Sequence, residues 1–251
     1  MSYIKLSPRM QVIADMTDKR NVADIGCDHA FVSIYLIQKG KADKVIATDI
    51  RKGPISIARN NIDMYGLTTS IDTRLSDGFD KIAVGEIEQA IISGMGGELI
   101  IDILKRGKAQ LEYGIDLILQ PQSEPEKLRK YLLDTGYIIT DEKMLVDDGK
   151  YYVVMKAVPY IAQSSLDNLI EIIRQNDNDS EFTDYSDVEL LYGKILISKK
   201  DAVLKEYLLM QLHKNNELIE KLSSVKTDNS MNKVIELKED IKKIKETLEC
   251  L

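Results

Sequence analysis

Short apolar runs that alternate with helix-forming stretches constrain the fold of this chain most strongly. The runs predict strands at 22–25, 45–48, 71–75, 90–93 and 116–119. A first helix is predicted with Ser7 as its cap and Pro8 as its first residue, and a last one with Ser123 as its cap. Between them, helices are predicted at 31–37, 53–65 and 98–104. Such alternation is typical of an α/β fold in which helices cover both faces of a parallel sheet.

The sheet is expected to end differently from how it begins. Residues 137–145 and 151–157 are strand-like, and the five residues between them predict an antiparallel hairpin. After Pro159 the strand signals largely disappear, and residues 176–180 form a polar loop. We therefore expect two domains, a sheet domain over 1–158 and a smaller α-helical domain over 159–251.

Two heptad-like seams mark the second domain. They consist of Leu208, Leu212, Asn215, Ile219 and Leu222, and of Val234, Leu237, Ile241, Ile244 and Leu248. With a short polar loop between them, the seams predict a coiled-coil-like antiparallel helical hairpin. It could be a helical pair that closes on itself or an arm that binds a partner or RNA.

Composition excludes several classes of protein. The 251 residues carry a net charge of −7, which argues against bulk electrostatic coating of nucleic acid but allows a local basic patch. Two cysteines make no disulfide framework, and two histidines exclude a multi-histidine metal site. No apolar run is long enough for a bilayer and no signal-peptide pattern follows Met1, so a cytoplasmic protein is expected.

The turn after the first strand, 24–30, is the most informative motif. Only Gly26 fits the Gly-x-Gly-x-x-Gly template of a pyrophosphate loop, and Asp28 stands where the second glycine would be. A carboxylate there would repel a pyrophosphate. It would suit a cofactor with a cationic end and ribose hydroxyls, for which Asp49 at the end of the second strand is an acceptor.

Polar or glycine-rich loops follow the other strands as well. They are 77–79, 93–97 and 120–122. Because ligands of open parallel sheets bind at the carboxyl ends of the strands, these loops and the first turn are expected to line one cleft.

Six motifs in this order resemble the bacterial tRNA adenine-N1 methyltransferases that modify position twenty-two. The motifs lie at 24–29, 48–50, 77–79, 94–98, 119–122 and 147–152. The resemblance covers about residues 1–158 and also fits the helical tail. It implies a Rossmann-like class I methyltransferase that uses S-adenosyl-L-methionine (SAM), acts on tRNA, and needs no metal, membrane or homo-oligomer.

The resemblance also implies roles for the strand-end residues. The Gly26 turn would lie against the methionine end of SAM, Asp49 would bind the ribose, and Asp77 would meet the adenine amino group. The implied cofactor contacts are Asp24, Gly26, Cys27, Asp28, His29, Asp49, Ile50, Asp77, Gly78, Ser93 and Gly94. Simpler roles stay open: Asp28 or Asp49 as a helix cap, Asp77 as a turn residue, His29 as an orienting residue and Cys27 as a small packed side chain.

The loop at 93–97 lacks the proline and aromatic residue of enzymes that methylate exocyclic amines, which fits a ring-nitrogen target. Asp28 is the candidate catalytic residue, as a carboxylate that stabilises a cationic base or takes a proton from N6. Candidate substrate contacts are Arg9, Arg51, Lys52, Met95 and Gly96, and further possible phosphate contacts are Lys5, Lys105, Arg106 and Lys108. The residue that stacks on the target base is not identified.

Two other functions fit parts of the sequence. A nicotinamide-dependent oxidoreductase would share the first two motifs, although the missing loop glycines count against it. A non-catalytic protein could use the Rossmann-like domain as a scaffold and the helical hairpin to bind a partner.

Overall fold

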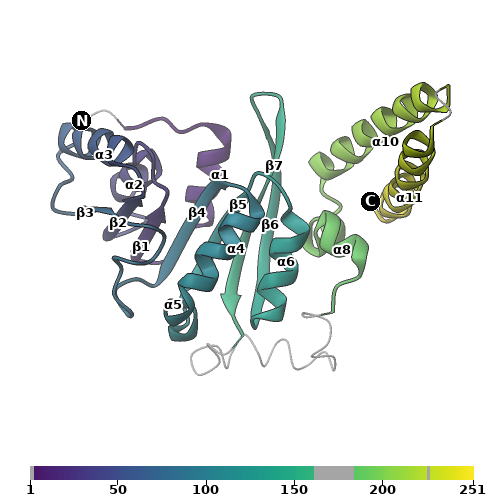
Figure 1. Cartoon of the computed structure of the whole chain (residues 1–251). Helices are drawn as coiled ribbons and strands as arrows, with labels where there is room; N and C mark the ends of the chain where they lie inside the picture. The colour runs from purple at the N-terminus through teal and green to yellow at the C-terminus, as the bar shows by residue number, and fades with distance from the viewer. Residues whose placement is uncertain (1–2, 161–183, 225–226) are drawn as a thin grey trace. The chain divides into compact units, whose positions relative to one another are not determined.

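The structure is a computed structural model that describes residues 3–160, 184–224 and 227–251. The chain divides into two compact units, Met1–Asp184 and Tyr185–Leu251 (Figure 1). The first unit is built on one sheet of seven strands in the order β3-β2-β1-β4-β5-β7-β6. The strands are β1 (Asn21–Ile25), β2 (Lys44–Asp49), β3 (Ile71–Leu75), β4 (Gln89–Met95), β5 (Asp116–Pro121), β6 (Tyr137–Asp147) and β7 (Lys150–Pro159).

The first five strands are parallel, as the alternating pattern predicts. Strand β1 pairs with β2 on one side and with β4 on the other. Successive strands are thus added on one side of β1 up to β3 and on its other side from β4 onward, and the switch point lies between β1 and β4. In an open α/β sheet such a switch point forms a crevice at the carboxyl ends of the strands. The topology thus places the motifs at 24–29, 48–50 and 93–97 at the same edge of the sheet.

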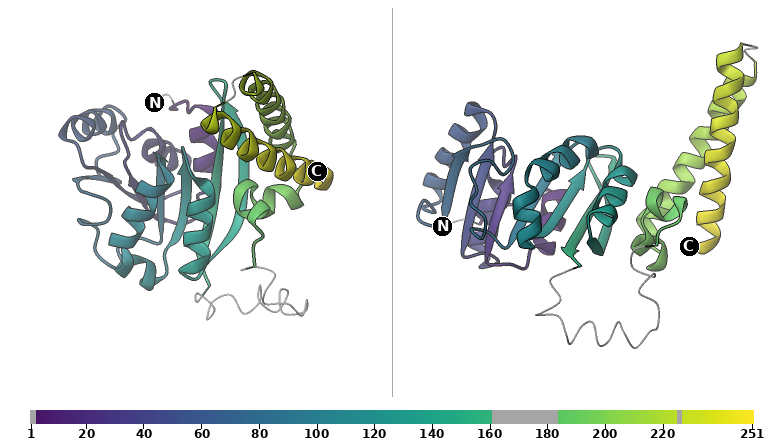
Figure 2. Two further views of the ribbon diagram at one scale, coloured as in Figure 1. Left: turned by 45° about the vertical axis from the view of Figure 1, so that its right-hand side comes forward. Right: turned by 60° about the horizontal axis from the view of Figure 1, so that its bottom comes forward.

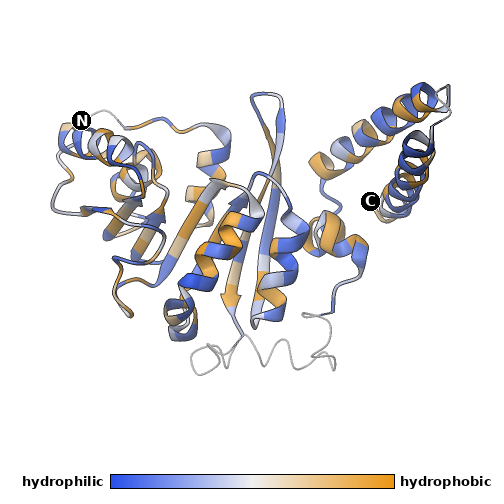
Figure 3. Cartoon of the chain, in the orientation of Figure 1, coloured by the Kyte–Doolittle hydropathy of each residue, from blue (hydrophilic) through white to orange (hydrophobic). Residues whose placement is uncertain are grey.

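Helices cover both faces of this sheet. They are α1 (Pro8–Met16), α2 (Phe31–Gln38), α3 (Lys52–Met64), α4 (Gly97–Arg106), α5 (Lys108–Tyr113) and α6 (Pro125–Asp134). Helices α1, α2 and α3 share one buried cluster with the strands, whereas α4 packs against β4, β5 and α6. Right-handed crossovers on the two sides of the switch point place α2 and α4 on opposite faces. Strand β4, in the middle of the sheet, is largely hydrophobic (Figure 3).

The predicted hairpin is confirmed, and its turn is tighter than expected. Strands β6 and β7 pair up to Asp147 and Lys150, which leaves only Asp148 and Gly149 in the turn. Both have positive φ angles, 49° and 69°, as a two-residue hairpin turn requires. The second strand of the hairpin, β7, lies between β5 and β6 and is antiparallel to both.

The two capping predictions have different outcomes. The Ser7 side chain accepts a hydrogen bond from the Met10 backbone N–H and Pro8 opens α1, as expected. The prediction that Ser123 caps α6 is wrong. Glu124, with φ 54°, occupies the cap position, and the Ser123 hydroxyl donates to the Glu124 carboxylate instead.

The second unit consists of α8 (Asp187–Tyr192), α9 (Lys194–Ser198), α10 (Ala202–Ser223) and α11 (Asp228–Cys250). Helices α10 and α11 pack side by side as the predicted antiparallel hairpin (Figure 2). Leu208 and Leu237, one from each predicted seam, are buried. The Asp201 carboxylate caps α10 by accepting from two backbone N–H groups. Coiled-coil geometry, partner binding and a boundary at 158/159 stay predictions, and the polar loop at 176–180 lies outside the described residues.

Across the part of the chain that the structure describes, no helix combines the length and apolar content of a membrane span.

Candidate active site

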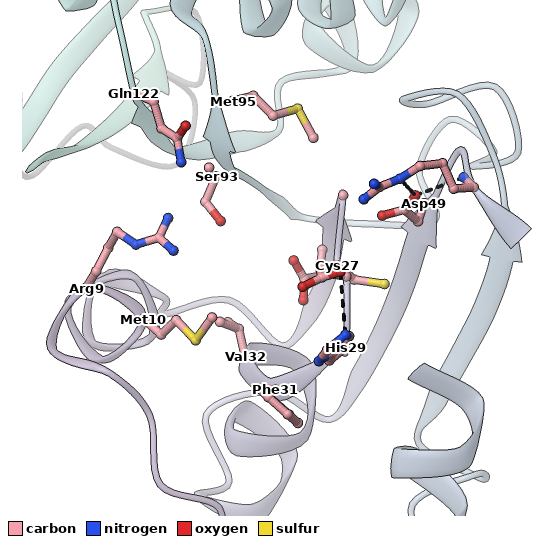
Figure 4. Close-up of a pocket in the computed structure, with 15 residues that line it drawn as sticks. Arg9, Met10, Cys27, His29, Phe31, Val32, Asp49, Ser93, Met95 and Gln122 are labelled. Carbon is pink, nitrogen blue, oxygen red and sulfur yellow. Dashed lines mark hydrogen bonds and ion pairs between the residues drawn. The ribbon is translucent and has the colours of Figure 1, made fainter. Parts of the chain in front are cut away.

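A cavity of about 330 Å³ opens at the carboxyl ends of β1, β2 and β4, beside the start of α1 (Figure 4). Its lining residues are Arg9, Met10, Asp24, Gly26, Cys27, Asp28, His29, Phe31, Val32, Asp49, Arg51, Ser93, Gly94, Met95 and Gln122. Most of the predicted site residues are therefore brought together. Ile50, Lys52, Asp77, Gly78 and Gly96 do not line this cavity.

The turn after β1 is held against β2 by backbone hydrogen bonds. The N–H groups of Gly26 and Cys27 both donate to the Thr48 carbonyl oxygen, at 2.8 and 2.9 Å. Gly26 has φ +76°, and a Cβ atom there would lie 2.2 Å from the Met95 Cε atom. The left-handed backbone favours glycine, and its missing side chain makes room for the end of Met95, which lines the cavity.

Asp28 lies at the cavity rim and caps no helix. The cap of α2 is Ala30, without a side-chain hydrogen bond, so the capping alternative for Asp28 is wrong. Its side chain is 62% exposed, and one of its carboxylate oxygens lies 3.8 Å from the His29 Nε2 atom. The carboxylate is thus available to a ligand or substrate in the cavity.

Asp49 serves the local turn and also lines the cavity. Its Oδ1 atom accepts a hydrogen bond from the Arg51 backbone N–H at 2.8 Å, immediately before α3. The second carboxylate oxygen makes no hydrogen bond within the described residues. A buried acceptor at this position is suited to a ligand hydroxyl group.

Asp24 is the most strongly perturbed carboxyl group in the cavity wall. It is buried, and the Ser33 hydroxyl donates to its Oδ2 atom at 2.6 Å. Burial raises the pKa of Asp24 to about 6, and the negative charge of Asp49 contributes to the rise. Burial also raises the pKa of the Cys27 thiol, which agrees with a small packed side chain.

The other side of the cavity is organised by Gln120, which is fully buried. Its Oε1 atom accepts hydrogen bonds from the Arg9 Nη1 atom at 2.7 Å and from the Gly94 backbone N–H at 3.1 Å. The Arg9 guanidinium also lies 5.2 Å from the centroid of the Tyr152 ring. Sequence reasoning placed 120–122 in the cleft but missed this role of Gln120.

Three lining residues were also missed, Met10, Phe31 and Val32. The sequence indicated an apolar side on α1 and a mainly apolar α2, but not which of their residues reach the cavity. Gln122 lies in the loop 120–122 after β5, which the sequence predicted to line the cleft.

The loop at 93–97 is fixed against the loop after β5. Gly97 donates its N–H to the Ser123 carbonyl oxygen, and Gln122 donates to the Met95 carbonyl oxygen. A Cβ atom on Gly97 would lie 2.7 Å from the carbonyl oxygens of Ser123 and Glu124. The missing side chain of Gly97 therefore permits close backbone packing between the two loops beside the cavity.

Asp77 and Gly78 lie outside the cavity. The Asp77 carboxylate is ion-paired with the Arg106 guanidinium, which holds the pKa of Asp77 below its usual value. The guanidinium of Arg106 is thus already engaged by a carboxylate. Contact between Asp77 and a cofactor adenine stays a prediction.

The cavity offers acceptor oxygens and no metal site. Within residues 3–160, 184–224 and 227–251 no cluster of three or more histidine, cysteine, aspartate or glutamate side chains could hold a metal ion. Three carboxylates, Asp24, Asp28 and Asp49, surround a space for a ligand. Such a donor set favours a ligand with positive charge and hydroxyl groups.

Comparison with known proteins defines the class first. A family model described as a methyltransferase domain matches residues 6–155, and the chain belongs to this class of enzymes. It is 32% identical to the tRNA (adenine(22)-N(1))-methyltransferase of Bacillus subtilis (strain 168) over 252 residues, 99% of each chain. The chain therefore belongs to the tRNA (adenine(22)-N(1))-methyltransferase family.

Solved structures agree with this assignment. The tRNA methyltransferase TrmK of B. subtilis has a TM-score of 0.77 and 31% identity, over 97% of this chain and 99% of that one. A Streptococcus pneumoniae protein in complex with S-adenosyl-L-methionine has a TM-score of 0.79 and 25% identity, over 97% and 100%. The predicted Rossmann-like fold and methyltransferase class are confirmed, against the oxidoreductase and scaffold alternatives.

Proposed function

We infer that the chain transfers a methyl group from SAM to N1 of adenine 22 in tRNA. The observation that carries this function is the strand-end cavity, in which three carboxylates surround a glycine turn in a chain of this family. This carboxylate donor set suits a sulfonium cofactor with ribose hydroxyls.

The residues present fit SAM. We propose that the Gly26 turn lies against the methionine end of SAM, where a Cβ atom on Gly26 would displace the end of Met95 in the cavity wall. Asp49 is the proposed acceptor for the ribose hydroxyls, and Asp24 the proposed partner of the ammonium group. Cys27, His29, Ser93 and Gly94 complete the wall. We propose that Ile50, Asp77 and Gly78 contact the adenine end, outside this cavity.

When bound, SAM supplies a methyl group on a sulfonium, and the N1 lone pair of adenine displaces the neutral thioether to form the N–CH₃ bond. This transfer leaves a positive charge on the base. Asp28 at the rim would stabilise that charge, or accept a proton from N6 to give the neutral imino form. Because N1 needs no prior deprotonation, positioning and exclusion of water are the main contributions expected from the other residues.

The tRNA must present an unstacked base to this cavity, since N1 lies on the Watson–Crick edge. We propose that Arg51 and Lys52 contact the tRNA backbone near the rim, and that Met95 and Gly96 contact the base. The sequence-based proposal for Arg9 was also a phosphate contact. That neither a second copy nor a membrane is required stays a prediction, as does a cytoplasmic location.

The function is tested with the full chain, methyl-labelled SAM and unmodified tRNA. We expect one N1-methyladenosine at position 22, located by mass spectrometry of digested tRNA, and no transfer to tRNA with guanosine at that position. Label at another nucleotide would contradict the proposed target. SAM binding without any transfer to tRNA would contradict the activity.

Asp28→Asn tests the proposed catalytic residue. We expect SAM affinity to be retained and kcat to fall by about 10- to 100-fold, because the amide cannot accept a proton or balance the positive charge. Asp63→Asn makes the same chemical change on the exposed face of α3 and is the matched control. Unchanged turnover of Asp28→Asn would remove Asp28 from the mechanism.

A further inference from the structure

Arg9 is held in a defined position at the cavity wall. Its Nη1 atom donates to Gln120 at 2.7 Å, and its guanidinium lies 5.2 Å from the Tyr152 ring centroid. Gln120 cannot rotate freely, since it is fully buried and its Nε2 atom donates to the Pro121 carbonyl oxygen at 2.8 Å. A neutral amide and an aromatic ring thus orient the cation without neutralising it.

The positive charge of Arg9 is not balanced by the chain. Among the residues that the structure describes, its guanidinium makes no ion pair. Asp147 accepts a hydrogen bond only from the Arg9 backbone N–H, at 3.3 Å. The guanidinium points toward Ser93 and Gln122 across the cavity (Figure 4). Its remaining N–H groups are therefore available to an anionic ligand.

Arg51, the other arginine of the cavity, has different surroundings. Its Nε atom lies 3.5 Å from the Asp49 Oδ1 atom, and its side chain is 69% exposed. Arg51 thus belongs to the side of the cavity proposed for the ribose and has a carboxylate partner. Arg9 is the cation that has none.

We propose that Arg9 binds the methionine carboxylate of SAM, and that Gln120 is the residue that positions Arg9 for this contact. The proposal rests on the proposed function. The amino-acid end of SAM carries both an ammonium and a carboxylate group, and the cavity provides Asp24 for one charge and Arg9 for the other. The Gly94 N–H donates to the same Gln120 oxygen, so Gln120 fixes the adjoining loop beside Arg9.

This role differs from the tRNA phosphate contact expected from the sequence. A phosphate contact favours a side chain that extends from the protein surface. Arg9 is half-buried, and its contacts with Gln120 and Tyr152 direct its guanidinium into the cavity. There it faces a ligand in the cavity and not the tRNA backbone. The structure therefore favours a small carboxylate ligand over a polynucleotide.

Calorimetry with SAM and with decarboxylated SAM separates the two roles. Wild-type protein is expected to bind decarboxylated SAM about 10- to 100-fold more weakly than SAM, because a charge-assisted hydrogen bond is lost. Arg9→Met is expected to bind the two compounds with nearly equal affinity. Arg51→Met removes the same charge from the same cavity and should keep the wild-type preference for SAM.

Gln120→Met tests the positioning role. We expect KM for SAM to rise while kcat at saturating SAM is largely retained, with a reduced preference for SAM over decarboxylated SAM. A merely structural role would lower the melting temperature of the ligand-free protein and leave that preference unchanged. This second result would overturn the role of Gln120.

Three other results of these binding experiments would overturn the proposed role of Arg9. If Arg9→Met keeps the wild-type preference but binds tRNA more weakly, Arg9 contacts phosphate and the carboxylate proposal is overturned. If wild-type protein does not bind SAM, the proposed function fails, and this proposal fails with it. SAM binding with no preference over decarboxylated SAM would overturn only the present proposal.

Discussion

Asp24 and Glu142 are buried carboxylates in strands of the same sheet, and their surroundings differ in one respect. Glu142 in β6 accepts a hydrogen bond from the Arg129 Nε atom at 2.8 Å, and both side chains are at most 1% exposed. Asp24 in β1 receives a hydrogen bond from the neutral Ser33 hydroxyl and lines the cavity. The chain balances the charge between α6 and β6 itself, whereas at the end of β1 it leaves a charge for a ligand to balance.

This difference separates a structural region from a functional one. A buried ion pair is costly to break, because removal of one partner leaves the other charge without compensation. A buried carboxyl group without a cation has a raised pKa, which is common at functional sites. Variants at the two places should therefore change stability in opposite directions.

The largest effect is expected at the structural pair. Arg129→Met should lower the free energy of unfolding by about 3–5 kcal/mol, because Glu142 then remains buried without its cation. Urea denaturation measures this loss. The double variant Arg129→Met/Glu142→Leu should recover most of it, and a double variant as unstable as the single one would contradict the explanation.

Asp24→Asn should have the opposite effect on the ligand-free protein. The pKa of Asp24 is raised from 3.8 to about 6, so its stabilising contribution is complete below pH 3.8 and is lost as the pH rises through 6. At pH 8 the variant should gain up to about 3 kcal/mol in unfolding free energy, and at pH 3.5 almost nothing. SAM affinity should fall. A variant that is less stable than wild type at pH 8 would contradict this interpretation.

A smaller effect is expected from Gly26→Ala, which changes the cavity floor without changing charge. The backbone φ of +76° costs about 1 kcal/mol with a side chain, and the new Cβ atom displaces the end of Met95. Gly40→Ala is a matched control, since it has φ +63° and no atom within 4 Å of the new Cβ. Both variants should lose similar stability, but only Gly26→Ala should lose SAM affinity.

The smallest effect is expected for the exposed pair between Asp77 and Arg106. Arg106→Met should change the free energy of unfolding by less than about 1 kcal/mol, because exposed ion pairs contribute little. A loss comparable with that of Arg129→Met would mean that exposure does not decide the difference between the two pairs.

Local patterns predicted most of the fold. Apolar runs located the parallel strands, and Ser7 with Pro8 located the start of α1, because neighbouring residues determine these features. Glu124 replaced Ser123 as cap because tertiary contacts of the loop after β5 set its backbone. Likewise, periodicity could not predict that β7 lies between β5 and β6, since this pairing depends on contacts far apart in the sequence.

The candidate site was predictable where motifs coincide with strand ends. Asp24, Gly26 and Asp49 follow from the parallel topology alone. The contact between Arg9 and Gln120 joins residues 111 positions apart, and no local pattern indicates it. The pair of Asp77 and Arg106 was missed for the same reason, because it depends on how α4 packs beside the loop after β3.

The central claim is that the cavity keeps an ionisable carboxyl group for the cationic end of SAM. Calorimetry at pH 6 in buffers of different ionisation enthalpy tests this claim by counting protons released on SAM binding. Wild-type protein should release about half a proton per SAM, because the ammonium group lowers the pKa of Asp24 from about 6, and Asp24→Asn should release none at this group. Equal proton release by both proteins would contradict the claim.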